Sequence, residues 1–195
     1  DLKYINAYSS VSHVGLVLFA LLMLNKTAWN GAILQSLSHG FMTALFFALI
    51  GMIYGRTHTR DIAKLGGLLK VIPFISVIYV IAGLASLGLP GFSGFVAEMN
   101  IFVGAFQQED TFMRVATILS ISVIVITAFY ILRVVGIMLM GPIKNDSYLK
   151  LEKVTWYERF GILLLLIPIV GIGVAPLWLS DMILESLDPF IKGLL

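Results

Sequence analysis

Five long stretches of this 195-residue chain contain at most one charged side chain each, and they constrain its fold more than any other feature. They run 4–25, 27–55, 71–108, 115–143 and 160–180. A helix that crosses the ~30 Å hydrocarbon core of a bilayer needs about 20 apolar residues, and each stretch is long enough. In lipid only helices and closed barrels satisfy every backbone polar group, and no alternation of polar and apolar residues supports a barrel. The sequence therefore predicts an all-α, polytopic membrane bundle.

The composition agrees with this fold class and excludes several kinds of chemistry. Hydrophobic residues make up 59% of the chain and charged residues 12%, whereas a soluble domain carries about 25% charged residues. Cysteine is absent, which excludes disulfides, thiolate metal sites and iron–sulfur ligation. The glycine pattern fits no nucleotide-binding loop, and nothing suggests nucleic acid as a partner. The chain begins with Asp1 rather than Met, so we expect a piece of a longer protein.

The third stretch is too long for one straight crossing. Residues 71–108 would form a helix of ~57 Å at 1.5 Å per residue, and residues 87–94 contain one proline and three glycines. Such residues break helices, so we expect one long, discontinuous span. The whole chain, 1–195, is predicted to be a single transmembrane domain. Its about five spans are expected at 5–25, 30–54, 71–108 (broken near 88–94), 114–140 and 159–180.

The loop charges favour one crossing over a hairpin at the third stretch. With one crossing, one side carries nine Lys and Arg residues and the other side three; with a hairpin the split falls to seven against five. The positive-inside rule then puts loops 56–70 and 144–159 in the cytoplasm and the C-terminus outside. We expect a bacterial inner membrane, with basic loops that meet lipid headgroups.

Two charged residues are candidates for a function inside the membrane. Glu98 follows the predicted break, and an ionised group at mid-membrane costs roughly 2.5–3.5 kcal/mol on insertion scales. It is a candidate for taking up and releasing protons, or it caps a helix and holds a neighbouring one. Lys3 is either an anchor at the membrane boundary or part of a cytoplasmic entrance to a polar axis.

Two histidines lie within predicted spans. His39 shares a helix face with Gln35 and Ser36, at i−4 and i−3. His13 has Ser9 one turn before it. Imidazole titrates near neutral pH and can relay protons, but either histidine can equally be a hydrogen-bonded packing residue.

Long motifs at these same residues resemble a known family. Residues 1–15 (DLKYINAYSSVSHVG), 38–40 (SHG), 56–62 (RTHTRDI) and 87–98 (LGLPGFSGFVAE) are similar to the antiporter-like membrane subunits of respiratory complex I, and to chain M (subunit 4) in particular. The resemblance covers about residues 1–106, while the last two spans match only in hydropathy.

The resemblance implies a fold of fourteen helices with two inverted repeats, of which this chain would hold the tenth to the fourteenth. It implies that Glu98 is the terminal acidic member of a line of charged groups through the membrane. The sister subunits usually carry Lys there. His39 then matches the histidine that links this carboxylate to a central lysine, and His13 matches a histidine on the preceding helix. Ala97 stands where the family commonly has Gly.

The function implied is proton translocation within NADH:quinone oxidoreductase, with Glu98, His39, His13 and, more remotely, Lys3 transferring protons. The enzyme would be a translocase of which this chain is a membrane subunit without a redox centre or metal of its own. NADH, FMN, iron–sulfur clusters and quinone would belong to partner subunits. Two alternatives remain: a subunit of a multisubunit sodium/proton antiporter or membrane-bound hydrogenase, and a structural membrane scaffold that transports nothing.

Overall fold

The computed structural model describes residues 1–194, apart from the side chains at 192 and 194, and this part of the chain is almost entirely helical. It contains no β-strand, so the predicted all-α fold class is confirmed. The elements are α1 (Leu2–Leu22), α2 (Lys26–Thr57), α3 (Leu68–Val71), α4 (Pro73–Ser86), α5 (Ser93–Phe106), α6 (Thr111–Met138), the 3-10 helix η1 (Asp146–Lys150), α7 (Trp156–Val174) and α8 (Leu177–Leu194).

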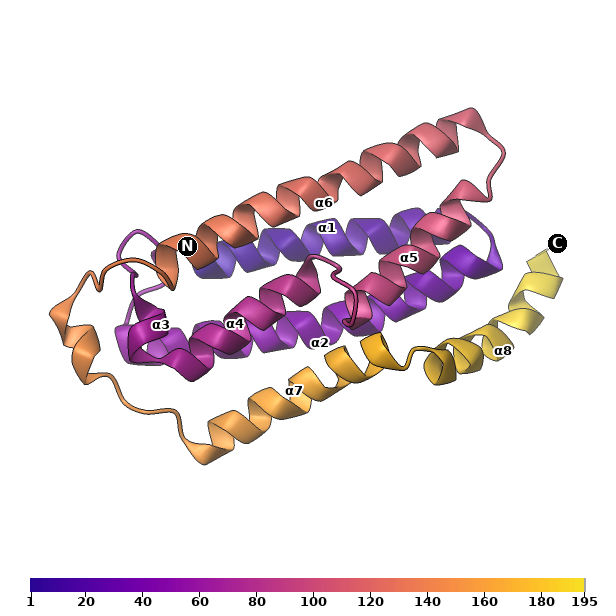
Figure 1. Cartoon of the computed structure of the whole chain (residues 1–195). Helices are drawn as coiled ribbons and strands as arrows, with labels where there is room; N and C mark the ends of the chain where they lie inside the picture. Colours follow the sequence, from indigo (N-terminus) through magenta and orange to yellow (C-terminus); the bar gives the residue numbers. More distant parts are fainter. Residues whose placement is uncertain (195) are drawn as a thin grey trace.

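Four of the helices within residues 1–194 are long and apolar enough to cross a membrane, namely α1, α2, α6 and α7. Two shorter apolar helices, α4 and α5, follow one another along the bundle instead of folding back (Figure 1). Each has 14 residues, or roughly 21 Å, so neither crosses a ~30 Å core alone. Together they form one discontinuous helix, as the sequence predicts, while the exact membrane boundaries stay predictions.

Glycine makes the break between α4 and α5 possible. The backbone is left-handed at Gly88, with φ +64°, and at Gly91, with φ +97°. Residues other than glycine rarely adopt this backbone conformation. Pro90 lies between them and lacks the backbone N–H that a continuous helix needs. The two turns therefore end α4 and allow α5 to begin at Ser93.

Helix α2 holds the bundle together, because α1, α4, α5, α7 and α8 all pack against it. Its closest neighbour is α5, and the approach depends on a glycine. A methyl group at Gly31 would lie 2.6 Å from the backbone nitrogen of Ile101 and 2.9 Å from the carbonyl oxygen of Ala97. The two backbones thus touch where α2 crosses the discontinuous helix.

The loops predicted to share one side of the membrane gather at one end of the bundle. The amide of Leu2 donates to the carbonyl of Arg60 at 3.0 Å, which ties the start of α1 to the loop after α2. Lys144 donates to a carbonyl of the same loop. The guanidinium of Arg56 pairs with Glu158 at 2.7 Å and so joins the end of α2 to the start of α7.

The last predicted span, 159–180, differs from the structure. Helix α7 begins at Trp156 and ends at Val174, because Pro176 cannot continue it and disfavours helical geometry at the residue before. A further helix, α8, follows instead and was not predicted. The charged residues of this segment end the charge-free stretch, so it was not recognised as a helix. Its apolar residues nevertheless recur every four positions, at Leu179, Ile183, Leu187 and Ile191.

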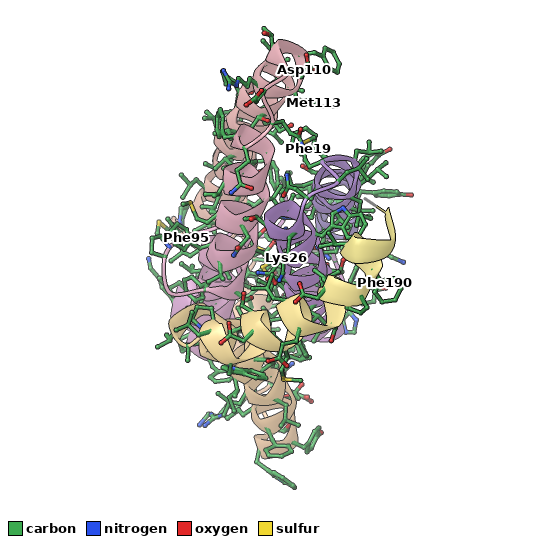
Figure 2. The ribbon with its side chains drawn as sticks, turned by 90° about the vertical axis from the view of Figure 1, so that its right-hand side faces the viewer. Phe19, Lys26, Phe95, Asp110, Met113 and Phe190 are labelled. Carbon is green, nitrogen blue, oxygen red and sulfur yellow. The ribbon has the colours of Figure 1, made fainter. Side chains whose placement is uncertain are left out.

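Helix α8 lies across the end of the bundle at which α2 begins (Figures 1 and 2). Its buried Ile183 and Leu187 pack in a cluster with Leu34 of α2. At its far end Asp188 forms an ion pair with Lys26. The helix is amphipathic, and its carboxylates at Asp181 and Glu185 are exposed.

The close approach at Gly31 gives a prediction for stability. We expect Gly31→Ala to lower the unfolding free energy by about 1–3 kcal/mol, because the methyl group meets backbone atoms that cannot move aside. Gly51→Ala on the same helix is the matched control, since nothing lies within 4 Å of its Cβ position. Thermal unfolding of the purified complex in detergent checks both. Equal unfolding temperatures for the two variants would contradict the packing described.

Candidate functional site

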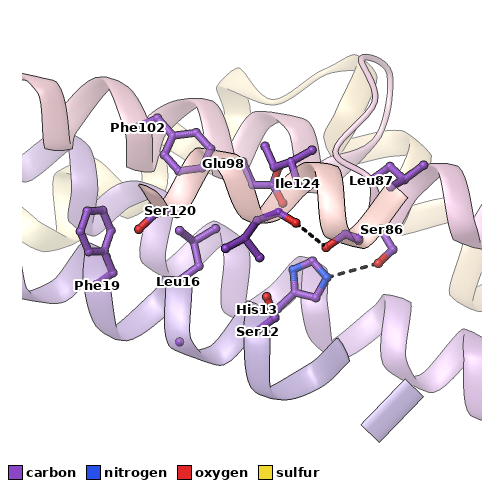
Figure 3. Close-up of a pocket in the computed structure, with 13 residues that line it drawn as sticks. Ser12, His13, Leu16, Phe19, Ser86, Leu87, Glu98, Phe102, Ser120 and Ile124 are labelled. Carbon is purple, nitrogen blue, oxygen red and sulfur yellow. Dashed lines mark hydrogen bonds between the residues drawn. The ribbon is translucent and has the colours of Figure 1, made fainter. Parts of the chain in front are cut away.

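A cavity of about 200 Å³ lies between α1, α4, α5 and α6, next to the break in the discontinuous helix (Figure 3). Six of its thirteen lining residues have polar side chains. These are Ser12, His13, Ser86, Glu98, Ser120 and Thr127. A cavity of this size with several polar partners can hold water molecules, so a carboxyl group, an imidazole and four hydroxyls share one hydratable space between α1, α4, α5 and α6.

Glu98 occupies the second turn of α5 and is 7% exposed. The carboxyl group turns back towards the break, so closely that a methyl group at Gly88 would collide with its Oε2 atom. None of the ion pairs among the described residues includes Glu98. A buried carboxyl group without a cation beside it is expensive when ionised, and it is suited to gain and lose a proton through the cavity.

His13 has a hydrogen-bond partner at each ring nitrogen. Its Nε2 lies 3.2 Å from the hydroxyl of Ser86, and its Nδ1 lies 3.0 Å from Nε2 of Gln35. The amide therefore donates to Nδ1, and the ring donates from Nε2 to Ser86. The Oε1 atom of Gln35 is buried and has no partner among the described residues. A half-turn of the amide would present this oxygen to a protonated Nδ1, so the same neighbours can serve both charge states of the ring.

His39 lies beside His13, with ring centroids 5.3 Å apart. Its hydrogen-bond partner is the hydroxyl of Thr43, at 3.3 Å. The neighbours expected from the sequence are not its partners: Gln35 binds His13, and Ser36 is exposed and bonds to the carbonyl of Ala32. The two histidines thus form one cluster, although they come from different helices.

Serines flank this cluster on both sides of the break. Ser86 ends α4 and bonds to His13, and Ser93 begins α5 and bonds at 2.6 Å to Ser38, the residue before His39. Sequence reasoning missed Ser86 and Ser93 as site residues. The sequence did place both serines next to the predicted break. Small polar residues at such a position can form hydrogen bonds with polar groups on neighbouring helices.

Lys3 does not join the site. It lies in the first turn of α1 with an exposed side chain, and its backbone amide donates to the Asp1 carboxylate at 2.8 Å. His13 lies further along the same helix, about 15 Å away at 1.5 Å per residue. Within the described part of the chain, no group of three or more His, Cys, Asp or Glu could hold a metal ion.

The fold and the site together indicate a class of membrane protein. A helical bundle with a discontinuous helix and ionisable groups beside the break is typical of membrane proteins that move ions. The transmembrane family described as NADH:quinone oxidoreductase/Mrp antiporter matches residues 1–127, and the chain belongs to this family. It is therefore an integral membrane protein, and the resemblance inferred from its motifs is confirmed.

Relatives with curated names point to one branch of the family. The chain is 38% identical over 180 residues to NAD(P)H-quinone oxidoreductase chain 4 2 of Thermosynechococcus vestitus, covering 90% of this chain and 34% of the relative. It is 34% identical over 176 residues to NADH-quinone oxidoreductase subunit M of Rickettsia conorii, covering 90% of this chain and 35% of the relative. The chain thus spans about a third of the length of these relatives.

A solved structure confirms the antiporter-like fold. The match is to a chain in respiratory complex I from Thermus thermophilus with bound NADH, with a TM-score of 0.84 and 25% sequence identity. It covers 97% of this chain and 39% of that chain. The fold of the chain therefore also occurs in a subunit of a multisubunit membrane complex.

The partners of His13 give a second prediction. We expect Gln35→Leu to lower the unfolding free energy by about 1–3 kcal/mol, because Nδ1 of a buried ring loses its only described partner. Ser36→Ala is the control on the next residue, whose side chain is exposed. Thermal unfolding of both variants in detergent tests this, and a Gln35→Leu variant as stable as Ser36→Ala would contradict the hydrogen bond.

Proposed function

We propose that this chain supplies part of the proton-translocating membrane subunit of an NADH:quinone oxidoreductase, in which Glu98 takes up and releases protons. The observation that carries the proposal is the position of Glu98. Its carboxyl group is buried, has no cation beside it among the described residues and faces a hydratable cavity that it shares with His13. A carboxylate kept only for stability would be expected to have a close charged partner.

The geometry supports a short route for the proton. Water in the cavity can exchange a proton with the Glu98 carboxyl group, and His13 lines the same cavity. His13 can pass the proton on to Ser86, or towards His39, whose ring lies 5.3 Å away centroid to centroid. Gln35 holds the ring of His13 in place for both directions. Because Lys3 lies outside this cluster, any part it plays is at the membrane surface.

The driving force would come from other subunits. Residues of this chain hold no redox centre in the proposed mechanism, and NADH, FMN, iron–sulfur clusters and quinone would be bound by partner subunits. A change of charge or conformation at a contact with those subunits would change the proton affinity of Glu98. The enzymatic role of the chain is therefore that of a subunit in a translocase.

The proposed setting is a bacterial inner membrane, surrounded by lipid and by other membrane subunits. Five crossings are proposed, with α4 and α5 as one crossing and with loops 56–70 and 144–159 in the cytoplasm. The gathering of these basic loops at one end of the bundle supports this orientation. The start of α8 would then lie towards the outside.

Two alternatives make different predictions. The family also includes Mrp antiporters, so a sodium/proton antiporter or a membrane-bound hydrogenase could use the same groups. Transport that requires Na⁺, or a neighbouring gene for nickel–iron chemistry, would favour this class. A structural scaffold would instead leave transport unchanged when Glu98, His39 and His13 are replaced by neutral residues of similar size.

The decisive variant is Glu98→Gln in the complete complex. In inverted vesicles we expect NADH-driven proton uptake to fall about a hundredfold, since a positioned proton-transfer group contributes roughly 10²–10⁴ to rate, while the complex stays assembled. Glu185→Gln is the matched control, because Glu185 is exposed on α8. An unchanged rate of NADH-driven proton uptake in Glu98→Gln, with the complex assembled, would overturn the proposal.

A second pair of variants tests where the carboxyl group must lie. Gly88→Ala and Gly91→Ala both place a methyl group on a left-handed residue of the break, which costs about 1–2 kcal/mol. Only the methyl group at Gly88 meets Glu98, since nothing lies within 4 Å of the Cβ position at Gly91. We expect Gly88→Ala to slow proton uptake and Gly91→Ala to leave it near the wild-type rate; equal losses would contradict the geometry.

A further inference from the structure

Ser86 lies where three cavities meet. It lines the cavity of Glu98, and it also lines two smaller ones of about 20 Å³ and about 10 Å³. The two small cavities share the side chains of Asn6 and Ser9 on α1. They lie on the opposite side of Ser86 from Glu98, towards the end of the bundle where α1 begins. The Ser86 hydroxyl thus connects the proposed proton site with a second polar region.

Asn6 is the unexplained group in this region. Only 8% of this residue is exposed. The Nδ2 atom has no hydrogen-bond partner among the described residues. A buried amide donor without a partner costs about 1–3 kcal/mol, so buried polar groups of this kind are usually satisfied by protein or by ordered water.

The larger of the two small cavities has room for one water molecule. A single water molecule needs about 10–15 Å³ and two to four polar partners, and this cavity measures about 20 Å³. Its lining is mixed. Besides Asn6, four hydroxyl-bearing residues line it (Ser9, Tyr79, Ser86 and Tyr130), and so do four apolar residues (Ile5, Phe46, Ile131 and Val134). The cavity of about 10 Å³, which also touches His13 and His39, is at the lower limit for one water molecule.

The polar region continues towards the surface beyond Asn6. The hydroxyl of Tyr130 donates to the hydroxyl of Ser9 at 2.8 Å. Both residues also line a groove of about 460 Å³ between α1 and α6, which reaches Asp1 and Tyr4 at the start of α1. Polar groups therefore extend from Ser86 to the end of the bundle that carries the basic loops.

We infer that Asn6 and Tyr130 hold ordered water that joins Ser86 to this end of the bundle. This water would connect the cluster of Glu98 and His13, through Ser86, to the start of α1. We call this connection the branch. Asn6 is then a positioning residue, which acts through the bound water and does not touch Glu98. The role of the branch in transport rests on the proposed function, whereas the presence of the water site does not.

A map of the complete complex at a resolution that shows ordered water tests the site directly. The expected result is density within hydrogen-bond distance of Nδ2 of Asn6 and of a hydroxyl of Ser9, Ser86 or Tyr130. An Nδ2 atom that donates to a protein atom instead, with no water density in this cavity, would overturn the site.

Variants of Asn6 test the branch in inverted vesicles. Asn6→Leu fills the cavity without a donor and is expected to slow NADH-driven proton uptake about tenfold, less than loss of the proton carrier itself. Asn6→Ser keeps a donor and leaves room for a second water molecule, so it should retain uptake. Asn30→Leu is the matched control, since Asn30 is also buried but bonds to Ser180, far from the branch. Equal rates for Asn6→Leu and Asn6→Ser would overturn the branch.

These results separate the two proposals. Loss of uptake in Glu98→Gln together with normal uptake in Asn6→Leu would leave the proposed function intact and overturn the branch. Normal uptake in Glu98→Gln would overturn the proposed function, while the density at Asn6 would still decide whether the water site exists.

Discussion

A carboxyl group inside an apolar helical bundle imposes conditions on everything around it. Ionised and unpaired, Glu98 would be costly to bury, so it requires polar neighbours or water within reach. The fold supplies both by interrupting the helix that carries it. The left-handed turns at Gly88 and Gly91 end α4, and the absence of a side chain at Gly88 leaves space for the carboxylate. The helix break therefore provides both the cavity and the space that the Glu98 carboxyl group needs.

The arrangement depends in turn on α2, which contacts most of the bundle. Its Gly31 lets α5 approach to backbone contact, and the same helix carries Gln35, Ser38 and His39 towards the break. Because these residues recur every three or four positions, one face of α2 presents them together. The helix face that packs against α5 therefore also carries the polar side chains of the site. A change that moves α2 away from α5 would also disturb the hydrogen bonds that α2 makes to His13 and Ser93.

Much of this could be predicted from the sequence, and the remainder depended on contacts between distant segments. The charge-free stretches predicted the all-α class, and the proline and glycines near Pro90 predicted the discontinuous helix. The sequence suggested Gln35 as a neighbour of His39, but the tertiary fold places it against His13 on another helix. Helix α8 was missed because its charges ended the hydropathy pattern, although its apolar stripe has a helical spacing. The orphaned amide of Asn6 could not be predicted, since burial of one atom has no signal in the sequence.

The most direct test of the central claim is infrared difference spectroscopy of the complete complex, recorded as NADH is added. If Glu98 exchanges protons during turnover, the C=O stretching band of a protonated carboxyl group should change, and this change should disappear in Glu98→Gln while the control Glu185→Gln retains it. A carboxyl band that does not respond to NADH, or a response that persists in Glu98→Gln, would contradict the claim that Glu98 carries the proton.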